Sequence, residues 1–202
     1  MMILRTSSPS PFGRKVRIAA GLAGLTGAIE IVAADTADPD GALAKLNPLG
    51  KIPVLTLSGG ATYFDSRVIV EFFDHLAGGD VLIPASPAAR FDCLTRAALA
   101  DGVMEASILQ IYEQRMRDPG KQDPAWLARQ AEKAERGLAA FAAAPPCGKR
   151  DAAHIGLAAA LGYLDLRFEG AWRQRFPGLA AWLEAFAAEV PAFAATRADR
   201  TG

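Results

Sequence analysis

A proline at the head of an apolar run constrains the fold of this chain more than any other feature. Residues 47–55 read NPLGKIPVL, so a turn is followed by Ile52, then Pro53, then the apolar pair Val54 and Leu55. Proline has no backbone N–H, and it is therefore confined to the start, the edge or a bulge of a strand. The stretch predicts a strand that begins at Pro53 rather than one that passes through it.

Short alternating elements surround this strand in the first part of the chain. The patterns predict strands over 2–4, 29–32, 53–57 and 62–64, and helices over 12–25, 38–46 and from Asp65 or Ser66 to His75. Asp38-Pro39 opens the second helix as a cap followed by a proline. Gly59-Gly60, after Ser58, favours a hairpin turn between the last two strands. The expected order is β-α-β-α-β-β-α.

The character of the sequence changes after Leu76. Glycine and proline punctuate residues 78–87, which we expect to form a linker. Beyond it the alanine-rich sequence favours helices. They are expected over 88–117, 126–143, 151–167 and 176–188, with a short one from Val190-Pro191. The sequence predicts an α/β domain over residues 1–77 and an all-α domain over residues 88–202.

Composition excludes several classes of protein. The net charge is zero, which removes the usual electrostatic basis for nucleic-acid binding. No stretch of about 20 apolar residues predicts a membrane span, and the early apolar run lacks preceding basic residues, unlike a signal peptide. The two cysteines, Cys93 and Cys147, are far apart and predict neither a redox pair nor a metal site. We expect a cytoplasmic protein without nucleic-acid or membrane partners.

Three motifs in order carry a resemblance to a known family. Residues 10–17 (SPFGRKVR), 47–55 (NPLGKIPVL) and 64–69 (FDSRVI) together resemble the glutathione S-transferase family. Residues 176–183 (FPGLAAWL) resemble its last long helix, and residues 99–102 (LADG) resemble its bacterial serine-type members. The resemblance implies a thioredoxin-like α/β domain followed by an all-α domain, glutathione as co-substrate, no metal, and a homodimer.

The resemblance also implies where glutathione binds. The bond before Pro53 would be cis, so that the backbone of Ile52 pairs with the cysteinyl part of glutathione. Ser66, at a helix N-terminus, would hold the γ-glutamyl carboxylate, and Asp65 would face the γ-glutamyl ammonium. Both residues also fit simple helix capping, which is compatible with ligand binding. Lys51 fits either a contact to the glycyl carboxylate or a solvated turn.

Ser10 stands where the family places the residue that activates the thiol. A donor aimed at the sulfur, at a helix N-terminus, favours the thiolate. Ser7 and Ser8 are competitors, and a plain capping role for Ser10 is the alternative. Pro11 and Phe12 occupy positions at which redox-active relatives carry cysteine, which argues against a dithiol reductase.

The second substrate, a small hydrophobic electrophile, is expected between the domains. On the long helix, helical spacing suggests Met104, Ile108 and Tyr112 as its wall, with Ile111 and Arg115 as further candidates, although such stripes are often core. Phe12 is also expected to line this pocket. The prediction is a glutathione transferase, with a non-catalytic binding or regulatory protein of the same fold as the alternative.

Two further expectations concern the helical part. Asp151-Ala-Ala-His154 stands where many family members carry Ser/Thr-x-x-Asp, so the helix cap should be arranged differently, and His75 and His154 should be surface or structural residues. The dimer interface would draw on charged residues, namely Arg67, Arg90, Asp92 and Arg96.

Overall fold

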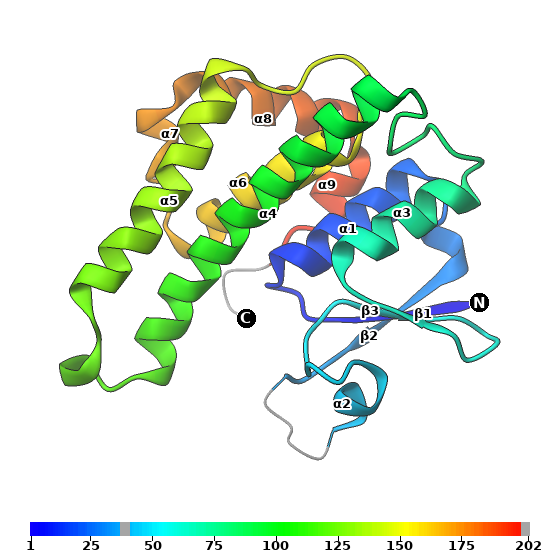
Figure 1. The fold of residues 1–202 in the computed structure, drawn as a ribbon, viewed down its shortest axis with the longest axis horizontal. Helices are drawn as coiled ribbons and strands as arrows, with labels where there is room; N and C mark the ends of the chain where they lie inside the picture. Colours follow the sequence, from blue (N-terminus) through cyan, green and yellow to red (C-terminus); the bar gives the residue numbers. More distant parts are fainter. Residues whose placement is uncertain (37–40, 199–202) are drawn as a thin grey trace.

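The first part of the chain is a four-stranded sheet with helices on both faces. The computed structural model describes residues 1–36 and 41–198. The elements here are β1 (Met2–Thr6), α1 (Pro11–Leu22), the 3-10 turn η1 (Thr26–Ala28), β2 (Ile29–Ala33), α2 (Ala42–Leu46), β3 (Val54–Thr56), β4 (Thr62–Tyr63) and α3 (Ser66–Leu76). The predicted βαβαββα order is confirmed (Figure 1).

The sheet order is β2-β1-β3-β4, with β1 parallel to β2 and antiparallel to β3. Helices α1 and α3 cover one face, and α2 lies against the other (Figure 1). Leu4 of β1 pairs with Leu55 of β3, and both side chains are fully buried. Val16 and Ile18 of α1 are also fully buried. The apolar run after Pro53 is therefore a core strand.

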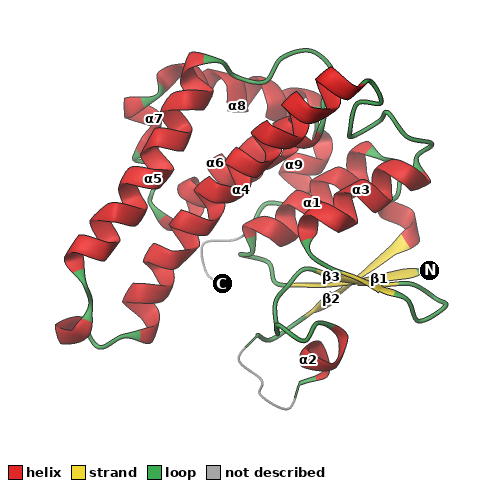
Figure 2. Cartoon of the chain, viewed as in Figure 1, coloured by secondary structure: helices red, strands yellow, loops and turns green. Residues whose placement is uncertain are grey.

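The second part of the chain is all helical in the residues described (Figure 2). It contains α4 (Pro87–Met116), the 3-10 turn η2 (Pro119–Lys121), α5 (Pro124–Ala143), α6 (Ala152–Arg167), α7 (Trp172–Arg175), α8 (Pro177–Glu189) and α9 (Pro191–Ala195). Helix α6 is central, because every residue from 152 to 164 is buried and it packs against α4 and α1. Within the described ranges, no helix combines the length and the apolar character that crossing a bilayer requires.

Some boundaries differ from the sequence prediction for local reasons. Helix α1 ends at Leu22 rather than Leu25 because Gly24 takes a left-handed conformation, with φ of 71°, which glycine adopts without strain. The predicted Asp38-Pro39 cap lies outside the described residues. Helix α7 was not predicted, since four residues are too few for an apolar period to show.

A buried ion pair joins the two parts of the chain. Lys15 Nζ of α1 lies 2.7 Å from Asp101 Oδ1 of α4, and both side chains are almost fully buried. Arg67 Nε of α3 donates to the other carboxylate oxygen of Asp101 at 2.8 Å. Asp101 thus connects the helix that follows Ser10 with the helix that begins at Ser66.

Candidate active site

A cavity of about 820 Å³ lies where the sheet part meets the helical part. Its walls come from the loop after β1, the turn before β3, the start of α3, and one side of α4 and α6. The predicted site residues that line it are Ser10, Phe12, Lys51, Ile52, Pro53, Asp65, Ser66, Ile108, Ile111, Tyr112 and Arg115. Ser10 and Ser66, which are 56 positions apart, therefore meet in one place.

The turn before β3 presents the backbone of Ile52 to the cavity. The Ile52–Pro53 bond is cis, as the resemblance implied. The ladder to β1 pairs only residues 54–56, so Ile52 lies outside it. Among the described residues, the backbone N–H and C=O of Ile52 have no hydrogen-bond partner. These two groups are available to a ligand that binds in an extended conformation.

Asn47 holds this turn in place and was not singled out in the sequence. Its side chain is buried, its Nδ2 donates to the carbonyl of Lys51 at 2.8 Å, and its Oδ1 accepts from Leu49 N at 3.1 Å. Gly50 closes the turn with φ of 61°. The Asn-Pro pair predicted a turn, but only the structure shows that the side-chain amide of Asn47 holds the backbone of Lys51, the residue before Ile52. Lys51 itself is exposed.

The start of α3 completes the half of the cavity that the sheet part of the chain forms. Asp65 is the N-cap, and its Oδ1 accepts from Arg67 N at 2.9 Å. Ser66 is the first helical residue, so its backbone N–H has no acceptor within the helix. It is 2% exposed, and its hydroxyl has no hydrogen-bond partner within the described residues. The helix end thus offers two donors and a partial positive charge.

Ser10 is the N-cap of α1, and its Oγ accepts from Gly13 N at 3.1 Å. Capping uses the hydroxyl as an acceptor and leaves its hydrogen free to donate. Gly13 allows α1 to begin this close to β1, because a Cβ there would lie 1.8 Å from Thr6 Oγ1. Ser7 lines the same cavity, whereas Ser8 lines a neighbouring one.

Helices α4 and α6 form the other half of the cavity. Ile108 and Tyr112 of α4 line it, but Met104 does not: its side chain is fully buried in the core. The assignment of Met104 to the cavity wall was wrong, because α1 covers this turn of α4, as the contact from Lys15 to Asp101 shows.

Two lining residues on α6, Tyr163 and Arg167, were missed in the sequence. The sequence of α6 is typical of a core helix, and no local pattern indicates that its last turns line the same cavity as Ser10. Only the packing of α6 against α1 brings them there.

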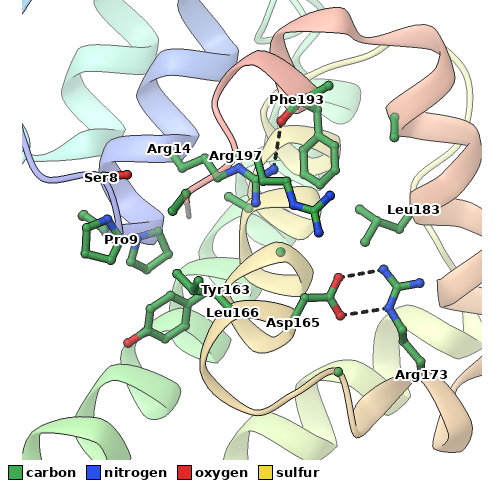
Figure 3. Close-up of a pocket in the computed structure, with 18 of the residues that line it drawn as sticks. Ser8, Pro9, Arg14, Tyr163, Asp165, Leu166, Arg173, Leu183, Phe193 and Arg197 are labelled. Carbon is green, nitrogen blue, oxygen red and sulfur yellow. Dashed lines mark hydrogen bonds and ion pairs between the residues drawn. The ribbon is translucent and has the colours of Figure 1, made fainter. Parts of the chain in front are cut away.

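A second cavity of about 700 Å³ lies on the other side of the loop that carries Ser10. Arg14 stands in it, with its guanidinium 4.1 Å above the Phe193 ring and donating to the Phe193 carbonyl at 2.9 Å (Figure 3). Burial, and then the nearby Arg197 and Arg17, lower the pKa of Arg14 to about 10. Arg14 therefore anchors the C-terminal helix to α1 and lies in this second cavity rather than in the first.

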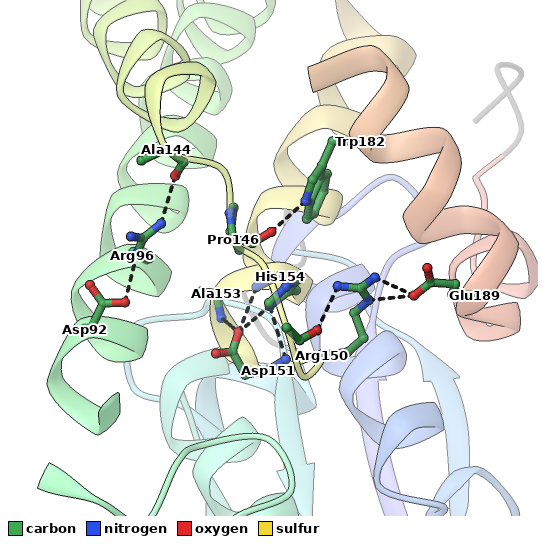
Figure 4. A network of polar contacts seen from close by, with 11 residues as sticks. Asp92, Arg96, Ala144, Pro146, Arg150, Asp151, Ala153, His154, Trp182 and Glu189 are labelled. Carbon is green, nitrogen blue, oxygen red and sulfur yellow. Dashed lines mark hydrogen bonds and ion pairs between the residues drawn. The ribbon is translucent and has the colours of Figure 1, made fainter. Parts of the chain in front are cut away.

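The cap of α6 is arranged differently from the family pattern, as expected (Figure 4). Asp151 Oδ1 accepts from Ala153 N and His154 N at 3.0 and 3.1 Å. His154 Nδ1 lies 2.7 Å from the same oxygen, which requires a proton on that nitrogen, so Nδ1 cannot also accept a hydrogen bond from Asp151 N, 3.4 Å away. His154 is a buried structural residue, and His75 is exposed; neither lines the two cavities described.

The charged residues expected at a dimer interface make contacts within the chain. Arg90 pairs with Glu71 at 2.6 Å. Figure 4 shows Arg96, which pairs with Asp92 at 3.0 Å and donates to the Ala144 carbonyl. In the part of the chain that the structure describes, no cluster of three or more histidine, cysteine or acidic residues is arranged to hold a metal ion.

Comparison with known proteins agrees with this geometry. Residues 9–76 match the family model "Glutathione S-transferase, N-terminal domain", and residues 124–185 match "Glutathione S-transferase, C-terminal domain". The uncharacterized GST-like protein YibF of Escherichia coli (strain K12) is 34% identical over 171 residues, which is 82% of this chain and 83% of YibF.

Solved structures extend the match over almost the whole chain. A glutathione transferase family member from Pseudomonas fluorescens Pf-5 with bound glutathione is 39% identical with a TM-score of 0.91, covering 98% of this chain and all of that one. The same organism's protein was also solved with S-(propanoic acid)-glutathione (38% identity, TM-score 0.88, the same coverage). A glutathione S-transferase from Methylobacillus flagellatus KT with glutathione bound is 37% identical, with a TM-score of 0.91 and coverage of 98% and 100%. The chain belongs to the glutathione S-transferase family.

Proposed function

We propose that this chain is an active glutathione transferase whose Ser10 hydroxyl activates the thiol of bound glutathione. One observation carries the proposal: the unpaired backbone of Ile52, the donors of Ser66 and the hydroxyl of Ser10 line the same cavity. Each of these groups can form a hydrogen bond that no described residue of the chain supplies. Together they match an extended peptide with a carboxylate at one end and a thiol in the middle.

Glutathione binds along the turn and the start of α3 in this proposal. The N–H and C=O of Ile52 pair with the cysteinyl residue in an antiparallel manner. The Ser66 hydroxyl and N–H bind the γ-glutamyl carboxylate, an anion suited to a helix N-terminus. Asp65 faces the γ-glutamyl ammonium, and Lys51 supplies the nearest cation for the glycyl carboxylate.

Ser10 then acts on the thiol as a hydrogen-bond donor. The thiol proton leaves to solvent, and the Ser10 O–H donates to the thiolate sulfur, whose lone pair forms the new bond to the electrophilic carbon. Lowering the pKa of the thiol by about two units requires about 2.7 kcal/mol. One charge-assisted hydrogen bond and the N-terminus of α1 supply stabilisation of this order.

The ligands of the relatives support this use of the cavity. The Pseudomonas fluorescens and Methylobacillus flagellatus proteins hold glutathione, and the first was also solved with a glutathione that carries a propanoic acid on sulfur. A site that accepts an S-substituted glutathione has room for a second substrate. In this chain the wall formed by α4 and α6 provides that room.

The test is a calorimetric titration with glutathione and a turnover assay against aryl halides and unsaturated carbonyl compounds. Ser66→Ala should weaken glutathione binding by about tenfold, the loss of one charge-assisted hydrogen bond. Ser10→Ala should largely spare binding and abolish most of the turnover. Ser8→Ala is the matched control, because Ser8 lines the other cavity.

Three results would contradict the proposal. Absence of binding at millimolar glutathione would remove the co-substrate. Binding without turnover on any electrophile would favour the non-catalytic alternative. Loss of turnover in Ser7→Ala but not in Ser10→Ala would move the activating role to Ser7.

We also propose that the chain forms a homodimer through α3 and α4. Val68 of α3 and Phe91 of α4 are exposed apolar side chains, and Phe91 is 67% exposed. The Arg90–Glu71 ion pair joins the two helices one residue before Phe91 and three residues after Val68. Light scattering after size-exclusion chromatography should give twice the chain mass, and Phe91→Ser should shift it toward a monomer. A monomeric wild type at micromolar concentration would refute this.

A further inference from the structure

The half of the cavity formed by α4 and α6 contains two arginines without an acidic partner. Arg115 near the end of α4 and Arg167 at the end of α6 both line it. No ion pair to either residue is formed within the described parts of the chain. Other arginines nearby are paired, such as Arg117 with Glu113 and Arg173 with Asp165.

Two tyrosines accompany these cations on the same helices. Tyr112 of α4 is partly exposed, whereas Tyr163 of α6 is 6% exposed. Burial raises the pKa of Tyr163, against the opposing effect of Arg167 and Arg115, so both guanidinium groups lie close enough to act on it. The neutral phenol of Tyr163 is not a counter-ion: its oxygen accepts a hydrogen bond from Arg167, and its O–H can still donate to a ligand.

Two acidic residues of the described chain line the cavity, Asp65 before α3 and Glu105 on α4, and Glu105 contacts Arg67 of α3 rather than Arg115 or Arg167. Asp65 caps α3, and Glu105 lies 3.4 Å from Arg67, which also pairs with Asp101. No described acidic residue lines the cavity beside Arg115 and Arg167. The cavity is therefore divided by charge: Asp65 and Glu105 lie around the start of α3, whereas Arg115 and Arg167, which have no acidic partner in the described chain, line it together with Tyr112 and Tyr163.

We propose that the electrophile of this enzyme carries a carboxylate, which Arg115 and Arg167 bind while Tyr112 and Tyr163 supply further donors. This rests on the proposed function and specifies its second substrate. Guanidinium groups bind carboxylates through paired N–H donors with a defined direction. Binding the carboxylate at the helical wall would direct the remaining carbon chain toward the sulfur at Ser10.

A substrate of this class is an α,β-unsaturated carboxylate. The thiolate lone pair forms a bond to the β-carbon, and the π electrons move to the α-carbon. The α-carbon then takes up one proton from solvent, which balances the proton that the thiol released to solvent. No leaving group and no oxidant or reductant is needed. The product is glutathione with a carboxyalkyl group on sulfur.

The test compares two product-like ligands that differ only in charge. S-(2-carboxyethyl)glutathione and S-(2-carbamoylethyl)glutathione are titrated calorimetrically, with glutathione itself as reference. The wild type should bind the carboxylate at least about tenfold more tightly than the amide, as expected for a charge-assisted hydrogen bond. Arg115→Gln with Arg167→Gln should remove this preference and retain the affinity for glutathione. Arg129→Gln, an exposed arginine of α5 outside the cavity, controls for the loss of charge.

Each contrary result has a separate meaning. Equal affinity for the two ligands in the wild type, with glutathione still bound, would overturn the inference and leave the proposed function intact. A preference that survives the double substitution would also overturn it. If the double variant weakened glutathione as much as the carboxyethyl ligand, the arginines would belong to the glutathione half and the inference would fail. A wild type that binds none of the ligands would refute the proposed function itself.

Discussion

Replacing Asp101 by asparagine should destabilise the protein severely, because it leaves Lys15 as a buried cation without a counter-ion. The Lys15 side chain is 2% exposed, and its ammonium lies 2.7 Å from the carboxylate that would be lost. Removing one partner of a buried ion pair costs about 3–5 kcal/mol. Arg67 adds little to this sum, since its side chain is 55% exposed and stays solvated.

The expected change in melting temperature follows from the size of the chain. For 202 residues the entropy of unfolding is about 0.4 kcal/mol/K, so Asp101→Asn should lower Tm by about 7–12 °C. Glutathione binding should weaken as well, because Asp101 connects the helices that follow Ser10 and begin at Ser66. Circular dichroism melts and urea titrations measure the first effect, and calorimetry measures the second.

A second substitution separates this explanation from a general loss of packing. In Lys15→Met/Asp101→Asn the buried cation is absent, so stability should recover by at least about 2 kcal/mol relative to Asp101→Asn alone. Glu105→Gln, which removes an exposed partner of Arg67, should cost less than about 1 kcal/mol. A double variant no more stable than Asp101→Asn would refute the reasoning.

Three further predictions concern other parts of the chain. Gly162→Ala places a Cβ 2.1 Å from Arg14 Nη1, so unfolding free energy should fall by about 1–3 kcal/mol, and this loss should vanish in an Arg14→Ala background. Burial raises the pKa of Asp151, but hydrogen bonds from the first turn of α6 outweigh it and hold that pKa below its usual value. The contribution of the Asp151 carboxylate to the free energy of unfolding is therefore complete above about pH 4. It is lost as pH falls through the folded-state pKa of this group. The stability gap to Asp151→Ala, about 1 kcal/mol at pH 7, should narrow below pH 4 in urea titrations. Burial raises the pKa of Cys93 to about 12, whereas Cys147 is exposed, so a thiol reagent should label only Cys147 until the protein is unfolded.

The parts of the fold that the sequence predicted are those with local signals. Pro53 after a turn, glycines at a hairpin and the change to alanine-rich helices each determine structure within a few residues. Together they predicted the βαβαββα order and the helical run that the structure shows. The domain limits at residues 77 and 88 remain a prediction.

The parts that were missed depend on packing between distant elements. Periodicity identified one apolar side of α4, but Met104 and Ile108 share that side, and only α1 decides which of them is covered. Tyr163 and Arg167 had no signal, because α6 is buried nearly all round and carries no helical stripe. Asn47 acts through one hydrogen bond from its side-chain amide to the carbonyl of Lys51. No sequence pattern predicts this contact.

The two halves of the cavity differ in the kind of group that builds them, and this explains why they differ in predictability. The half proposed to bind glutathione uses backbone groups and a helix N-terminus, such as those at Ile52 and Ser66, whose geometry follows from turn and capping motifs in the sequence. The half formed by α4 and α6 uses side chains such as Arg115 and Arg167, which line the cavity without contributing to the core. Arg115 is exposed and Arg167 is half-buried, and neither forms an ion pair within the described residues, so substitution there changes the charge of the cavity at little cost to folding. In the function proposed here, the fold keeps one co-substrate while a few residues set the second, and we propose that in this chain those residues include Arg115 and Arg167.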